Sequence, residues 1–171
     1  DASIADVIDV AEISRGTFYL YFDGKAALFL ELIERFITRM TEIVEVVDPH
    51  GPDPGSRILD NIRRVVDEAF SRPELTTVVL RESRGLHPEI DQKLDRLYGF
   101  LQEMVQGALI NGARTGLTRK VNEPAVATAL IGACKEVFLT QLPRGPVLPA
   151  AREAISLSLF ELGMRGLLIS R

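Results

Sequence analysis

The sequence of 171 residues contains only one cysteine and two histidines. Cys134 has no second cysteine with which to form an internal disulfide, which fits a reducing cytoplasm. His50 and His87 lie far apart and lack cysteine or carboxylate companions at ligand spacing. We therefore predict no metal site, no cofactor and a cytoplasmic location.

Catalytic motifs are also missing. The sequence has no Walker A loop, no G-x-S-x-G or H-E-x-x-H motif and no dinucleotide-binding glycine fingerprint. An enzyme on a helical bundle is therefore the disfavoured alternative, and no catalytic residues are predicted. Strand signals are almost absent, and no uncharged apolar run approaches the ~20 residues that a membrane helix needs. These absences predict an all-α protein without a membrane span.

Charge and hydrophobic content narrow the class further. The net charge of −4 argues against a protein that coats nucleic acid in general, although it allows a local basic patch on a protein that reads sequence. The hydrophobic content of 46% is enough for a real core. The length suits one domain, or a small head on a larger body.

The segment 14–22 has the pattern of a short helix with one apolar and one polar face. Phe18 and Phe22 are four residues apart, so they share the face that docks into a small core. Ser14 stands at the N-cap position, and Gly16 would let a sugar-phosphate strand come close. The opposite face carries side chains that can donate hydrogen bonds outward: Arg15, Thr17, Tyr19 and Tyr21.

A second short helix is predicted over 3–10, with 11–13 as a tight turn before the polar-faced helix. This order of elements is typical of a helix-turn-helix. The residues at 3–7, 13–22 and 25–28 resemble the DNA-binding signature of TetR-family transcriptional regulators. Two departures stand out. Glu12 occupies a turn position where the family usually has glycine, which predicts mild left-handed strain. The family also has a helix before Ser3, so we expect the DNA-binding domain to be incomplete at its N-terminus.

The resemblance implies a helix-turn-helix DNA-binding domain over 1–30 and a ligand-binding and dimerisation domain over 31–171. It implies a repressor that binds a palindromic DNA operator as a homodimer and is released by a small-molecule inducer. The alternative is a helical dimerisation module without sequence-specific DNA binding, which the weak local basic charge keeps open. The residues expected to contact DNA are Ser3, Ser14, Arg15, Gly16, Thr17, Tyr19, Leu20, Tyr21 and Lys25.

Some of these residues also have a simpler explanation. Arg15 and Thr17 lie on the first helical turn, where side chains reach base edges, but a solvated helix start has the same pattern. Tyr19 and Tyr21 either bind phosphates through their hydroxyls or pack beneath the helix. Lys25 opposes the macrodipole at the start of the next helix, which hints at a phosphate contact.

The rest of the chain shows helical spacing punctuated by proline and glycine. Ser56 is predicted to cap the second body helix, Gly116 to end the fourth, and Asn122 to begin the fifth. The helices predicted for the body, the first of which joins it to the head, are 25–47, 56–70, 73–83, 89–115, 123–142 and 150–169.

The last two predicted helices are apolar on most sides, so they should be buried on most sides. We expect them to pair with the same helices of a second chain in a four-helix interface. The alternative is that they form the core of a monomeric bundle.

An effector pocket between helices follows from the resemblance alone. The residues that would line it are Phe70, Val79, Leu101, Met104, Cys134, Phe138 and Gln141. For each of them, a place in the ordinary core is the simpler explanation.

Overall fold

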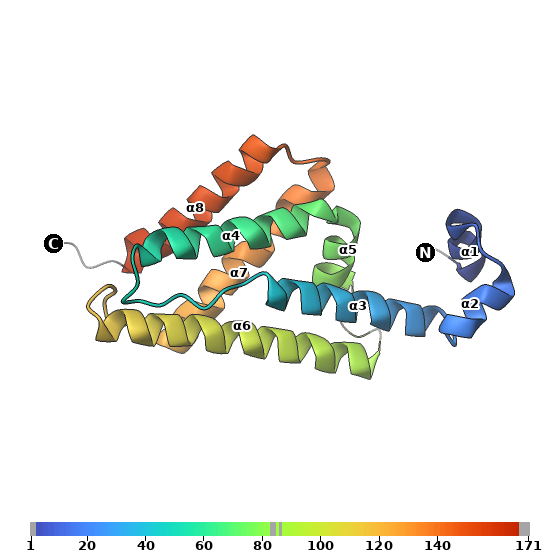
Figure 1. Cartoon of the computed structure of the whole chain (residues 1–171), viewed down its shortest axis with the longest axis horizontal. Helices are drawn as coiled ribbons and strands as arrows, with labels where there is room; N and C mark the ends of the chain where they lie inside the picture. Colours follow the sequence, from blue (N-terminus) through green and yellow to red (C-terminus); the bar gives the residue numbers. More distant parts are fainter. Residues whose placement is uncertain (1–2, 83–84, 86, 168–171) are drawn as a thin grey trace.

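The computed structural model describes residues 3–82, 85 and 87–167, and the regular elements in those ranges are all helices. A small head made of α1 (Ile4–Ala11) and α2 (Arg15–Tyr21) stands at one end of α3 (Lys25–Glu42), away from the body (Figure 1). The predicted all-α architecture, with a helix-turn-helix head on a larger helical body, is confirmed.

The body is a bundle around α3. Its further elements are α4 (Pro54–Ser71), α5 (Pro73–Thr77), the π-helical turn η1 (Val78–Glu82), α6 (Pro88–Arg114), α7 (Glu123–Gln141), the 3₁₀ turn η2 (Leu142–Arg144) and α8 (Pro149–Leu167). Gly116 ends α6 with a φ of 74°, and Asn122 caps α7, as predicted. The last helix was predicted to reach residue 169, but 168 and 169 lie outside the described residues.

The prediction that the first long helix continues to residue 47 is wrong, because α3 ends at Glu42. Residues 44–48 run in a non-helical strap towards α4 (Figure 1). Asn61 of α4 clasps this strap: its Oδ1 accepts the N–H of Glu45 at 3.0 Å, and its Nδ2 donates to the carbonyl of Glu45 at 2.8 Å. These two hydrogen bonds replace the backbone hydrogen bonds that Glu45 would make in a helix. The neighbouring valines are β-branched and have low helix propensity, so leaving the helix costs them little free energy.

Two further details of the body differ from the prediction. The cap of α4 is Asp53, whose carboxylate accepts the N–H and the hydroxyl of Ser56, so Ser56 lies inside the helix. This follows from Pro54, which occupies the first helical position that proline favours. The helix predicted over 73–83 is α5 followed by η1 as far as Glu82, and residue 83 lies outside the described residues. Thr76 of α5 is buried, with its hydroxyl bonded to the carbonyl of Ala69.

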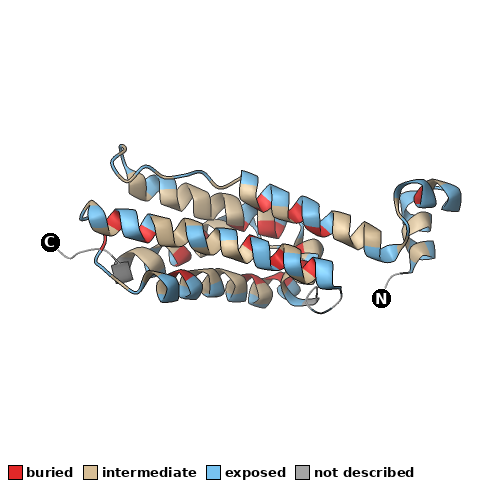
Figure 2. Cartoon of the chain, turned by 90° about the horizontal axis from the view of Figure 1, so that it is seen from below, coloured by how far each residue is buried: buried red, intermediate tan, exposed pale blue. Residues whose placement is uncertain are grey.

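The hydrophobic core lies in the body. Figure 2 shows buried residues along the facing sides of the body helices, whereas Phe18 is the one buried residue in the described part of the head. Phe70 of α4 and Phe138 of α7 meet edge to face, with ring centroids 5.8 Å apart. Such pairs add about 1 kcal/mol beyond the burial of area, so they fix α4 against α7.

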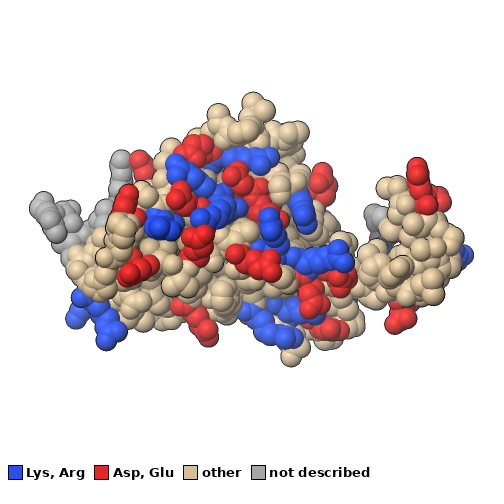
Figure 3. All heavy atoms as spheres, in the orientation of Figure 1, with Lys and Arg blue, Asp and Glu red and all other residues tan. Residues whose placement is uncertain are grey.

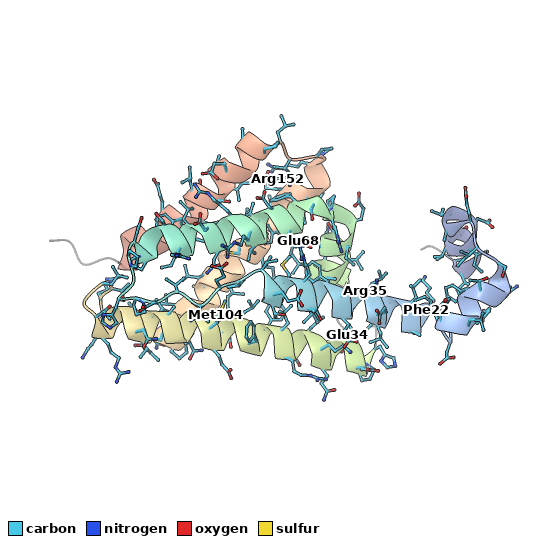
Figure 4. The ribbon with its side chains drawn as sticks, viewed as in Figure 1. Phe22, Glu34, Arg35, Glu68, Met104 and Arg152 are labelled. Carbon is cyan, nitrogen blue, oxygen red and sulfur yellow. The ribbon has the colours of Figure 1, made fainter. Side chains whose placement is uncertain are left out.

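Polar contacts hold α8 against α4. The guanidinium of Arg63 makes a two-pronged pair with the carboxylate of Glu153, at 2.9 Å and 2.5 Å, and this lowers the pKa of Glu153. Arg152 lies where α8 approaches the end of α4 (Figure 4), and it donates to the carbonyls of Val147 and Phe70. The orientation of the last helix is therefore set by contacts within the chain.

The segment Glu123–Arg144 meets the length and composition expected of a membrane-crossing helix, with a mean hydropathy of 1.3 in its most apolar window. Core helices of soluble proteins pass the same test. Only 17% of that window is buried within the chain, so most residues of α7 are half-buried or exposed.

The turn after α6 predicts a sharp difference between two glycines of that helix. An added Cβ at Gly112 would lie 2.7 Å from Oγ1 and 3.1 Å from Cγ2 of Thr118, which is itself buried, whereas nothing lies within 4 Å of one at Gly107. Gly112→Ala should therefore lower the free energy of unfolding by about 1–3 kcal/mol through overpacking. Gly107→Ala should leave it unchanged or raise it by up to about 1 kcal/mol. Urea denaturation measures both, and equal values for the two variants would contradict this packing.

Candidate DNA-binding interface

The head begins with a capping box on α1. The hydroxyl of Ser3 accepts the N–H of Asp6 at 3.2 Å, while the carboxylate of Asp6 accepts the N–H and the hydroxyl of Ser3 at 2.6 Å and 2.7 Å. These bonds lower the pKa of Asp6, because they favour the charged carboxylate. Ser3 is exposed, but its hydroxyl proton is already committed to Asp6.

The turn between α1 and α2 adopts the left-handed conformation expected of it. Glu12 has φ 54° and ψ 37°, and its N–H donates to the carbonyl of Asp9. The N–H of Ile13 reaches back to the carbonyl of Ile8 at 3.2 Å. Together these bonds close the end of α1 and set the direction in which α2 departs.

The start of α2 is built as the sequence predicted, with Ser14 as its cap. The hydroxyl of Ser14 accepts the N–H of Thr17 at 3.0 Å, and the two hydroxyl oxygens lie 2.8 Å apart. Phe18 is 2% exposed, and its ring lies 5.6 Å from that of Phe22 and 5.3 Å from that of Tyr19. This aromatic group anchors α2, so its other face points outward.

The outward face contains most of the residues predicted to contact DNA. Leu20 is 82% exposed, Tyr21 77% and Tyr19 46%. Ser14, Arg15 and Gly16 are exposed as well, and the guanidinium of Arg15 lies 6.0 Å from the ring centroid of Tyr19. Thr17 is half-buried, with its hydroxyl turned to Ser14. Lys25, also exposed, is the first residue of α3.

The head has little positive charge. Residues 3–25 contain two basic side chains, Arg15 and Lys25, against four acidic ones, Asp6, Asp9, Glu12 and Asp23. On the face shown in Figure 3, the head has few basic groups, whereas basic and acidic groups intermingle over the body. Attraction to any DNA, regardless of sequence, should therefore be weak.

Long-range contacts that the sequence did not reveal connect α3 to the body. Nζ of Lys93 on α6 donates to the carboxylate of Glu34 at 2.7 Å and lowers its pKa, and Nε of Arg39 lies 3.4 Å from the carboxylate of Glu68 on α4. Figure 4 shows Glu34 and Glu68 on the helices that meet at this junction. No periodic signal could have paired residues so far apart in the chain.

The residues predicted to line an effector pocket divide into two groups. Phe70, Val79 and Phe138 are buried in the body core, and the half-buried Cys134 packs against them; burial raises the pKa of its thiol. The other three residues are half-buried and lie outside that core cluster: Leu101 and Met104 on α6, with Met104 labelled in Figure 4, and Gln141 at the end of α7.

Comparisons with known proteins point the same way as this geometry. Residues 1–32 match the sequence model of the family described as bacterial regulatory proteins, tetR family. The chain is 26% identical over 169 residues to the uncharacterized HTH-type transcriptional regulator YdgC of Bacillus subtilis (strain 168), covering 96% of this chain and 83% of that protein.

Solved structures show the same fold over the whole chain. The TetR-family transcriptional regulator PfmR from Thermus thermophilus has a TM-score of 0.77 at 18% identity, covering 99% of this chain and 90% of that one. FadR from Bacillus subtilis, in complex with stearoyl-CoA, has a TM-score of 0.70 at 23% identity, covering 96% and 88%. The predicted fold is confirmed, and residues 1–32 match the predicted family.

The left-handed backbone at Glu12 should lower the stability of the head. Glu12→Gly should relieve roughly 1 kcal/mol of left-handed strain, partly offset by the greater flexibility of glycine in the unfolded chain. The amides of α1 and α2 should then exchange with solvent about twofold more slowly. Glu12→Ala is the matched control, since it removes the same charge and keeps the strain. Faster exchange in Glu12→Gly than in Glu12→Ala would contradict the prediction.

Proposed function

The head belongs to the TetR family of bacterial regulatory proteins and the whole chain has the fold of TetR-family regulators; from this premise we propose a repressor that binds a palindromic operator as a homodimer. A protein of this class is a transcription factor and not an enzyme. The observation that carries the proposal is the exposed polar face of α2, held outward by the buried Phe18. A cytoplasmic location, where the chromosome is, belongs to the same proposal.

In a helix-turn-helix, the second helix enters the major groove with its N-terminal residues towards base edges. This assigns base contacts to Arg15 and Thr17, and backbone contacts to the tyrosines and Lys25. Because the hydroxyl of Thr17 is bonded to Ser14, the methyl group is the part of Thr17 that suits a base, through contact with a thymine methyl. Arg15 can instead leave the ring of Tyr19 and make a two-pronged contact to guanine.

Two heads are needed because one head attracts DNA weakly. The acidic surplus over residues 3–25 removes most of the sequence-independent attraction. Two linked heads bind DNA more tightly than one, because binding of the first raises the effective concentration of the second. This gain in affinity requires that their spacing matches successive major grooves, about 34–36 Å apart. The body would therefore control the affinity for DNA by setting the distance between the two heads.

The exposed faces of α7 and α8 support homodimerisation. On α7, exposed small residues repeat at helical spacing, namely Ala125, Ala129 and Gly132. On α8, Ala154, Leu157 and Leu162 are exposed, the two leucines by 41% and 62%. Small residues allow close helix approach, and apolar ones gain from leaving water. The monomeric-bundle alternative would require these faces to be covered within the chain.

Release by a small-molecule effector forms the last part of the proposal. The core around Phe70, Val79, Cys134 and Phe138 is apolar, and the similar FadR structure contains stearoyl-CoA, so an effector with an apolar portion fits this region best. An effector that moves α6 would pull on α3 through the Glu34–Lys93 pair and so change the position of the head. We place the boundary between the DNA-binding domain, 1–30, and the effector and dimerisation domain, 31–171, within α3.

The second candidate function is a dimerising interaction module that does not read DNA sequence. The observation favouring it is the acidic surplus of the head. The two candidates differ in one measurable property, which is whether the full-length protein distinguishes one DNA sequence from another.

Substitutions on α2 and α3 should separate base reading from backbone binding. With DNA from upstream of its own gene, Arg15→Ala or Thr17→Ala should change the preference among operator variants, costing about 1–3 kcal/mol at the base contacted. Lys25→Ala should weaken all variants alike and reduce the salt dependence by about one counterion.

Fluorescence anisotropy at several salt concentrations measures both effects. Arg35→Ala is the control, because it removes an equal charge from the exposed Glu31–Arg35 pair further along α3. Equal, weak binding of the unmodified protein to all DNA sequences would favour the interaction module. Unchanged operator affinity in Arg15→Ala, Thr17→Ala and Lys25→Ala would contradict the proposed DNA-binding interface.

The dimer interface predicts opposite outcomes at two glycines. Gly132 of α7 and Gly99 of α6 both have open space where a Cβ would be added, so a side chain can start from either one without a clash at its Cβ. Gly132→Arg should place a charge in the proposed four-helix interface and yield monomers, whereas Gly99→Arg should leave dimers intact. Sedimentation equilibrium measures the mass. A monomeric unmodified protein, or a dimeric Gly132→Arg variant, would contradict the proposed interface.

A further inference from the structure

At the end of the body farthest from the head, the connection between α3 and α4 approaches the last turn of α6 (Figure 1). A surface pocket lies between the residues that follow the strap and this turn of α6. Its volume is about 390 Å³, and its lining residues are Pro49, His50, Asn111, Arg114 and Thr115. The pocket is separate from the proposed DNA-binding face and from the body core, so neither of those sites accounts for it.

The lining offers hydrogen-bond donors and one full positive charge. Within the described ranges, the guanidinium of Arg114 has no ion-pair or hydrogen-bond partner, unlike Arg63 and Arg152, which are bonded to carboxylates or carbonyls. The amide of Asn111 and the imidazole of His50 add further donors. Arg119 and Lys120 follow in the turn after α6, and Figure 3 shows basic groups gathered at that end of the molecule.

A helix C-terminus normally presents carbonyl oxygens, which would repel an anion. At this end of α6 the carbonyls are already used. The carbonyl of Asn111 accepts the N–H of Thr115 at 3.0 Å, and that of Gly112 accepts the N–H of Leu117 at 2.9 Å and the hydroxyl of Thr115 at 3.1 Å. These hydrogen bonds leave fewer free carbonyl oxygens to repel an anion at this end of the helix.

Asp48 directly precedes the lining residue Pro49 in the sequence and has its own hydrogen-bond partner. The carboxylate of Asp48 accepts the N–H of His50 at 2.9 Å, and Asp48 is not among the lining residues. Among the residues that line the pocket, Arg114 is the one with a full charge at neutral pH. Pro49 supplies an apolar wall next to these donors.

We propose that this pocket binds a small molecule through a carboxylate or phosphate group. Arg114 would make the charged, two-pronged contact, and Asn111 and His50 would supply the remaining hydrogen bonds. A bound anion would tie the strap to α6 and stabilise the folded chain by mass action. The proposal does not depend on DNA binding, because every group that it uses belongs to the far end of the body.

The test uses the full chain and two probes, inorganic phosphate and acetate, each titrated against chloride at equal ionic strength. Chemical shifts of the backbone amides report both the position and the saturation of binding. Binding should be saturable, should move the amides of residues 50 and 111–115, and should be tighter for phosphate because of its greater charge. Saturation by acetate alone would also support the pocket, with carboxylates as its class.

Arg114→Gln should weaken the binding by about tenfold or more. Arg144→Gln on η2 is the matched control, since it removes the same charge from an exposed position outside the lining and should leave the affinity unchanged. Both positions are exposed, so the fold should survive, which circular dichroism checks. Absence of saturation with either probe, shifts that map elsewhere, or equal loss in both variants would overturn the proposal and leave an adventitious ion only.

Discussion

The packing of α3 against the body is the contact on which the rest of the structure depends. Ile33, Phe36 and Met40 bury one side of this helix in the core, while its first turns extend past the body and hold the head. Because the same rod serves both parts, a displacement within the core reaches the head without an intervening flexible joint. Each of the ion pairs from α3 to α6 and α4 joins an exposed side chain on α3 to a half-buried partner on the body, and together they fix the orientation of α3.

The head has a much smaller hydrophobic core than the body. The body has an extended core in which aromatic rings from α4 and α7 interlock, whereas the described head is held together chiefly by Phe18 and its ring contacts. Helix caps therefore contribute a larger share of the stability of the head, namely the capping box of Ser3 and Asp6 and the N-cap at Ser14. A small domain with few buried side chains depends on such caps, each of which contributes about 1 kcal/mol.

Features encoded by neighbouring residues could be predicted from the sequence, whereas those that depend on distant residues could not. The caps at Ser14 and Asn122 and the left-handed Glu12 follow from rules that span a few positions. The end of α3 was missed because Asn61, far along the chain, supplies the hydrogen bonds that let the strap leave the helix. The cap of α4 was misplaced although Pro54 was a usable signal. The outward face of α2 was predicted, but the commitment of the Thr17 hydroxyl to Ser14 depends on rotamers that no pattern reveals.

The strap clasped by Asn61 has a mechanical consequence. Helical backbone stops at Glu42, and the residues that follow are bonded to Asn61 and Arg64 of α4, so the far end of α3 is pinned to α4 and a tilt of the rod would pivot about that end. Its 18 residues span about 27 Å, so a tilt of roughly 10° about one end would sweep the other through about 5 Å. In the proposed dimer, that arc would be doubled across the twofold axis, which is comparable to the rise of several base pairs and would move the two heads away from the spacing of successive major grooves.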